Sequence, residues 1–167
     1  MNTIFHFVSL TLLVIASGCT LETVDSHIDV DFDALAEGVE SHNTVSVNPN
    51  ENPDVVANRD YIKGIDVSNI VFTVRSIGET NRAQSGSGEV YVRAAGADWD
   101  AEPIATFEET PVEVGVTKTL AVTPEQIARI EALMTDAFEA RIDGHVDQGP
   151  LSFGGRLTFD VQIRAGL

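Results

Sequence analysis

Cysteine is almost missing from this chain, because Cys19 is the only one among 167 residues. A single cysteine excludes a disulfide within the sequence, so the fold depends on its hydrophobic core for stability. It also excludes a zinc site built from several thiolates. The histidines that follow (His27, His42 and His145) stand at no metal-ligand spacing from one another or from Cys19.

Basic residues are scarce as well. Ten Lys and Arg stand against 26 Asp and Glu, for a formal net charge of −16, and the only lysines are Lys63 and Lys118. No basic patch is visible, which excludes nucleic acid as a partner and disfavours adsorption to anionic lipid headgroups. The negative surface predicts solubility through self-repulsion, and a salty or divalent-rich environment is the alternative explanation.

Sequence motifs for catalysis are missing too. The chain contains no G-x-S-x-G, no His-Glu-x-x-His, no P-loop and no dinucleotide-binding fingerprint. Ser85 and Ser87 lie in a Gly/Ser-rich stretch without a base nearby in sequence, and nothing selects one pair of carboxylates. The sequence therefore predicts no catalytic residues and no enzyme, and it favours a binding or structural module.

What the chain does have is an apolar run from Ile4 to Ala16, followed by Ser17, Gly18 and Cys19. The run is shorter than the roughly 20 residues that span a bilayer, and it has the length of a signal-peptide core. Small residues leading to a cysteine resemble the lipobox of bacterial lipoproteins. An ordinary secretory signal cut near Gly18, or a buried N-terminal helix, would be the alternatives.

The resemblance implies that residues 1–18 are a signal peptide, removed when Cys19 becomes the lipidated first residue. Palmitate and related acyl chains on Cys19 would then hold the protein in a membrane of the cell envelope. Thr20 follows Cys19 directly. In these proteins an Asp at that position favours retention in the inner membrane, so Thr20 implies the outer membrane as the location. If the signal is instead an ordinary secretory signal cut near Gly18, we expect a secreted protein.

Short strands dominate the rest of the pattern. The segments 138–147 and 153–165 alternate apolar and polar side chains around a Gly149-Pro150 turn, which predicts a long antiparallel hairpin. Thr123, Pro124 and the apolar spacing that follows predict one helix over 123–137. We expect a tether over 19–27 and a single domain over 28–167. The predicted fold is mainly β, an antiparallel, immunoglobulin-like β-sandwich with one helix before the C-terminal hairpin.

A divalent-ion site is the second hypothesis on named residues. Carboxylates fall at calcium-ligand positions 1, 3, 5, 9 and 12 of an EF-hand loop, namely Asp29, Asp31, Asp33, Glu37 and Glu40. Ala34 stands where the sharp turn of that loop needs Gly, and Ile28, Val30 and Phe32 alternate as in a strand. A strand with an acidic solvent face is therefore the competing interpretation. Calcium is the only cofactor that the sequence suggests.

The expected function is that of a lipid-anchored envelope protein without catalytic activity, which binds an envelope protein or a glycan. Trp99, between Asp98 and Asp100, is a candidate for stacking on a sugar or a partner, or else for covering one end of the core. An envelope hydrolase with a carboxylate- or metal-based site is the alternative function. A lipid-carrying sandwich, with an apolar cavity between its sheets, is a third.

The lipobox interpretation predicts the behaviour of Cys19→Ala. Without the alkylated thiol the protein should leave the membrane fraction and incorporate no labelled palmitate. Fractionation of cells that express the full chain measures this, with Ser17→Ala, two residues away, as the matched control. Unchanged membrane partitioning of Cys19→Ala would contradict the interpretation.

Overall fold

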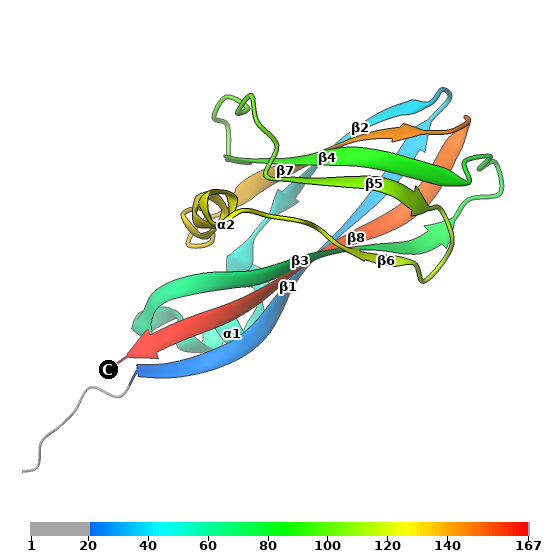
Figure 1. Cartoon of the computed structure of the whole chain (residues 1–167). Coiled ribbons are helices and arrows are strands. Elements are labelled where there is room, and N and C mark those ends of the chain that lie inside the picture. Colours follow the sequence, from blue (N-terminus) through cyan, green and yellow to red (C-terminus); the bar gives the residue numbers. More distant parts are fainter. Residues whose placement is uncertain (1–20, 167) are drawn as a thin grey trace, which may run out of the picture.

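A computed structural model describes residues 21–166, of which strands make up the greater part (Figure 1). The eight strands are β1 (Leu21–Ala36), β2 (Glu40–Val47), β3 (Ile62–Ile77), β4 (Ser85–Ala94), β5 (Ala105–Pro111), β6 (Thr117–Thr119), β7 (Phe138–Val146) and β8 (Leu151–Gly166). The helical elements are η1 (Pro49–Glu51), α1 (Pro53–Asn58), η2 (Arg59–Tyr61) and α2 (Pro124–Glu131). No helix among the described residues is long and apolar enough to cross a membrane.

The strands form two antiparallel four-stranded sheets, in the orders β1-β8-β3-β6 and β2-β7-β4-β5. All connections except that from β4 to β5 lead from one sheet to the other. A sandwich of two antiparallel sheets is confirmed. Its immunoglobulin-like topology is not, because that fold joins consecutive strands within one sheet, whereas eight strands in this alternating order form a jelly roll.

The predicted C-terminal hairpin is wrong for the same reason. β7 pairs with β2 and β4, while β8 pairs with β1 and β3 in the other sheet. Both strands bury every second residue against one shared core, so each shows the same alternation. The period of two identifies the buried face of a strand but does not identify its sheet.

The predicted helix before these strands is confirmed, although it is shorter than expected. Thr123 accepts a hydrogen bond from the Gln126 backbone, and the Gln126 side chain accepts one from the Thr123 backbone, which closes a capping box. Pro124 occupies the first turn, and α2 ends at Glu131. Ile130 and Met134 are fully buried beneath this segment.

The domain begins earlier than its apolar pattern indicates. β1 starts at Leu21, within the segment expected to be a tether over 19–27. Ser26 takes an inward position in β1, and its hydroxyl donates to Asp54 of α1 at 2.6 Å. A polar residue at a core-facing position hides the alternation from a hydrophobicity pattern, which is why the prediction placed the start at Ile28.

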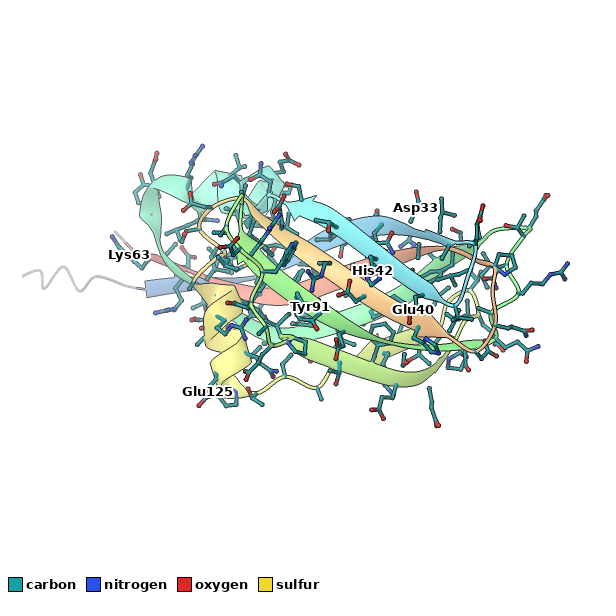
Figure 2. The ribbon with its side chains drawn as sticks, turned by 90° about the horizontal axis from the view of Figure 1, so that it is seen from above. Asp33, Glu40, His42, Lys63, Tyr91 and Glu125 are labelled. Atoms are coloured by element: carbon teal, nitrogen blue, oxygen red, sulfur yellow. The ribbon has the colours of Figure 1, made fainter. Side chains whose placement is uncertain are left out.

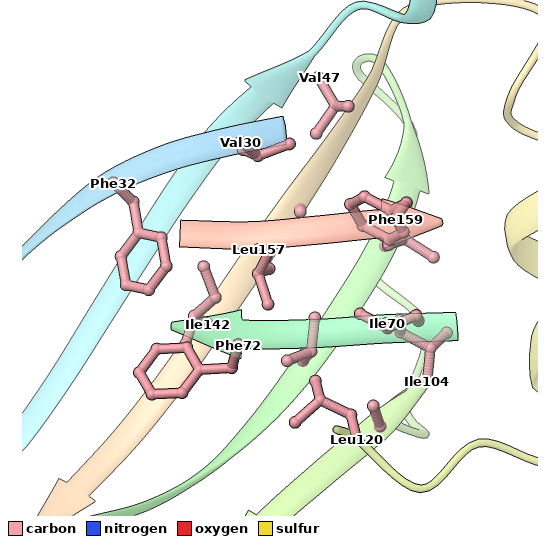
Figure 3. Close-up of a cluster of buried hydrophobic side chains, with 14 of the residues drawn as sticks. Val30, Phe32, Val47, Ile70, Phe72, Ile104, Leu120, Ile142, Leu157 and Phe159 are labelled. Carbon is pink, nitrogen blue, oxygen red and sulfur yellow. The ribbon is translucent and has the colours of Figure 1, made fainter. Parts of the chain in front are cut away.

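The core between the sheets is filled (Figure 3). Phe138 of β7 and Phe159 of β8 meet edge to face across it at 6.2 Å between ring centroids, and Phe72 stacks on Phe107 at 5.1 Å. An apolar void between the sheets measures about 30 Å³, room for a water molecule or two. A lipid-carrying cavity, which needs hundreds of Å³, is therefore not formed in the described part of the chain.

Candidate functional site

Three acids of the predicted calcium site, Asp29, Asp31 and Asp33, lie on the solvent side of β1, beside β8. Arg156 holds Asp31 through Nε and Nη2 at 2.7 and 2.8 Å, and Asp29 through Nη1 at 2.7 Å. Thr158 also donates to Asp29, at 2.7 Å. The hydrogen bond from Arg156 is the main cause that lowers the pKa of Asp31 below its usual value.

The calcium-loop geometry is therefore wrong, and the strand interpretation holds. Asp29, Asp31 and Asp33 alternate along β1, so neighbouring carboxylates start roughly 7 Å apart and do not converge on one ion. Glu37 follows in the turn, and Glu40 opens β2 in the other sheet. Among residues 21–166 no three Asp, Glu, His or Cys side chains are arranged to hold a metal.

A large hollow lies on the outer face of the β2-β7-β4-β5 sheet, and Figure 2 shows this sheet from above. It is open and has a volume of about 790 Å³. Gly86, Gly88 and Gly144 form its floor with small serines, so the longer side chains rise around it. Its ionisable lining residues are Glu40, His42, Glu89, Glu108, Glu109, Asp143, His145 and Asp147. We call this surface the acidic hollow.

Hydrogen bonds orient one carboxylate at each end of the acidic hollow. At one end, the backbone N–H groups of Gln84, Ser85 and Gln148 donate to Asp147 at 2.9, 3.2 and 3.0 Å. These bonds lower the pKa of Asp147, with the one from Gln84 as the largest cause. At the other end, the Tyr91 hydroxyl donates to Glu89 at 2.5 Å, which raises the pKa of Tyr91. The lowered pKa keeps the Asp147 carboxylate ionised at neutral pH.

A band of paired charges and aromatic rings borders the hollow. Arg141 lies 3.0 Å from Asp143 as an ion pair without the alignment of a hydrogen bond, and its guanidinium covers Tyr91 at 4.4 Å. His42 also pairs with Asp143, at 2.9 Å.

Trp99 belongs to the same band, because the guanidinium of Arg93 lies 4.1 Å from its ring centroid and that of Arg141 lies 4.7 Å away. Arg93 in turn pairs with Glu139 at 2.6 Å. Trp99 therefore covers cations on the outer sheet face, and it does not close one end of the core as one interpretation of the sequence held.

One arrangement in the hollow has no signal in the sequence. The strand register places His145 of β7 directly opposite Glu40 of β2 on one side and opposite Ser87 of β4 on the other. An acid, a histidine and a serine thus stand in one row across three strands. Glu40 and Ser87 lie 105 and 58 positions from His145 in the chain, so only the pairing of β7 between β2 and β4 brings them together.

The other predicted site residue, Cys19, lies outside the described residues, as do residues 1–18. The row of Glu40, His145 and Ser87 and the Arg141–Trp99 contact were not foreseen, since both depend on strand pairing. Alternation alone did place His145 on a wet face between Asp143 and Asp147, and it lies there.

No family model matches the sequence, and no curated protein does. Solved structures of viral proteins align with most of the chain at low similarity. Desmodium yellow mottle tymovirus has a TM-score of 0.48 at 10% identity, over 99% of this chain and 97% of that one. The decameric BFDV capsid protein has a TM-score of 0.48 at 13% identity, over 87% of this chain and 99% of that one. Turnip yellow mosaic virus has a TM-score of 0.42 at 9% identity, over 89% of this chain and 96% of that one. Likeness this distant carries no conclusion about function.

The Arg156 cluster predicts a pH-dependent contribution to stability. Because Arg156 lowers the folded-state pKa of Asp31, the contribution is present above the unfolded pKa, about 3.9, and is lost as pH falls through the lower folded value. Arg156→Gln should lower the free energy of unfolding at pH 7 by no more than about 1 kcal/mol, since both acids are solvent-exposed.

The difference between Arg156→Gln and the parent protein should shrink as pH falls below about 3.9 and through the lower folded-state pKa of Asp31, because a protonated Asp31 no longer forms an ion pair with Arg156. Urea unfolding at pH 7 and at low pH measures it. Lys118→Gln, an exposed change on β6 that breaks no ion pair among the described residues, is the matched control. A difference that stays constant with pH would contradict the assignment.

Proposed function

We propose that this chain is a lipid-anchored module of the bacterial cell envelope that binds a basic partner in the acidic hollow. The lipobox-like residues before Cys19 support the anchor, and Thr20, which follows Cys19, favours the outer membrane. The binding role rests on the hollow. A partner protein of the envelope with an exposed Lys- or Arg-rich segment is the occupant whose chemistry fits.

The observation that carries the proposal is the sign of the lining charges. Six carboxylates surround the hollow, while none of its lining residues is Lys or Arg. A concave surface of one sign focuses its field, which speeds the encounter with an oppositely charged segment and excludes acidic competitors. The surrounding arginines, Arg93 and Arg141, are each paired with a carboxylate and covered by an aromatic ring.

A glycan fits the same surface less well. Sugars commonly stack on an open aromatic ring, but Tyr91 is only 8% exposed and Trp99 already lies against guanidinium groups. A neutral sugar also gains nothing from six negative charges. The aromatic residues of this face are better explained as a support for Arg93 and Arg141 than as a platform for carbohydrate.

Binding without catalysis is favoured by the state of the acids. Glu40, Glu89, Glu108 and Glu109 are exposed. Catalytic carboxylates are usually made reactive by burial or by a close like charge, which raises their pKa. The hollow instead leaves these four carboxylates exposed to solvent, where a cationic segment can reach them.

Charge reversal in the hollow tests the binding role. Glu108→Lys with Glu109→Lys should abolish capture of the basic partner by the anchored protein, and added salt should weaken capture by the parent protein. Cross-linking in the native envelope, followed by purification of the chain, measures this. Glu125→Lys combined with Asp136→Lys, also exposed but next to α2, gives the matched control. Recovery of the same partner by the Glu108/Glu109 variant would refute the proposal.

A hydrolase is the second candidate, and one observation favours it. The row of Glu40, His145 and Ser87 has the residue types and order of an acid–base–nucleophile set, in an open hollow that can admit a substrate. No hydrogen bond joins the three side chains in the structure, so the set is not assembled. The cationic group of an ester substrate would match the surrounding carboxylates.

Ser87→Ala separates these two functions. If the chain is a binding module, the variant keeps partner capture, and the parent protein shows no labelling by a fluorophosphonate probe. If it is a hydrolase, the parent protein is labelled and Ser87→Ala is not. Ser85→Ala, two residues along the same face of β4 and outside the row with His145, is the control.

A further inference from the structure

The end of the sandwich where β1 begins carries two of the six large hydrophobic side chains that are exposed among the described residues. They are Val56 of α1 and Tyr61 of η2, with 54% and 48% of their surface exposed, and the other four lie elsewhere. Arg59 and Lys63, in the same segment, are exposed and form no ion pair with another described residue. We call residues 56–63 the proximal segment.

The strand register places the proximal segment beside the start of the domain. Leu21, the first residue of β1, pairs with Gly166 of β8, and Ile62, the first residue of β3, pairs with Ala165. Tyr61 therefore lies about two strand spacings, roughly 10 Å, from Leu21. Figures 1 and 2 agree, since α1 and Lys63 lie at the end where β1 starts.

Little chain separates this end from the predicted anchor. Cys19 is two residues before Leu21, and two residues span at most about 7 Å. The tether over 19–27 expected from the sequence would have reached roughly 30 Å and left the domain free to face any direction. Because β1 begins at Leu21, acyl chains on Cys19 would bring the proximal segment to the headgroups.

The chemistry of the proximal segment suits that position. Tyrosine is enriched at the membrane–water interface, and lysine and arginine there reach lipid phosphates while their stems lie along apolar groups. Within the proximal segment Asp60 is the one acid beside Arg59 and Lys63, although the chain carries −16 overall. A segment of small net charge with apolar and aromatic side chains matches a zwitterionic phospholipid surface.

We propose that Val56, Arg59, Tyr61 and Lys63 rest on the membrane that holds Cys19, so that the sandwich stands away from it. β1 runs for 16 residues, about 50 Å, from this end to the turn before Glu40. The acidic hollow, lined by Glu40 and by the start of β4, then opens far from the membrane. The inference rests on the proposed anchor and adds the orientation of the domain.

A depth measurement tests the orientation. The lipidated full chain carries Val56→Cys, labelled with an environment-sensitive fluorophore, in phosphatidylcholine vesicles that contain nitroxide-labelled lipid. Val114→Cys is the matched control, because that valine is 64% exposed and lies by Val74, roughly 40 Å along β3 from Ile62. Lipidation blocks Cys19, so the new thiol is the only one available for labelling.

The label at position 56 should lose most of its emission to the nitroxide, while the label at position 114 keeps its emission. Equal emission from the two labels on vesicle-bound protein would overturn the orientation and leave the anchor standing. Protein that does not bind the vesicles at all would overturn the anchor and the orientation together. Cys19→Ala in the Val56→Cys chain should restore full emission.

Discussion

The shared core between two sheets is the constraint on which the rest of this molecule depends. With every connection but one crossing between the sheets, each strand must turn its apolar side chains towards the same interior. Phe138 and Phe159 show this directly, since they come from consecutive strands in opposite sheets and meet at the centre. Most polar side chains of the strands therefore point outward, where ion pairs and acids cover both faces, and Ser26 is a buried exception.

The acidic hollow follows from that arrangement. β7 lies between β2 and β4, so outward residues distant in the chain form rows across three strands. Gly88 has no side chain because the Phe107 ring lies 2.5 Å from where its Cβ would stand. Packing beneath the sheet thus explains why glycine forms part of the floor of the hollow, while the longer acidic side chains rise around it. The opposite sheet carries Arg156 among its acids and has its negative charge compensated locally.

The sequence predicted the local features well and the topology poorly. Alternation identified the buried faces of β7 and β8, and the cap at Thr123 identified the start of α2, because these signals lie within a few residues. Sheet membership depends on which distant strands pair, so the hairpin and the immunoglobulin-like order were wrong. The spacing of acids from Asp29 to Glu40 suggested a loop, whereas Phe32 and its apolar neighbours required a strand. Because Ser26 is a polar residue at a core-facing position, the alternation of hydrophobic residues did not indicate that β1 starts at Leu21.

We propose different tasks for two parts of the sandwich: the end beside Cys19 rests on lipid, and the distant acidic hollow binds a basic partner. Amide hydrogen exchange of the full chain, compared between purified protein and protein in its own envelope, tests this most directly. We expect new protection over residues 56–63 and over the β2, β4 and β7 backbone of the hollow. Protection confined to the outer face of β1 and β8 would contradict the account.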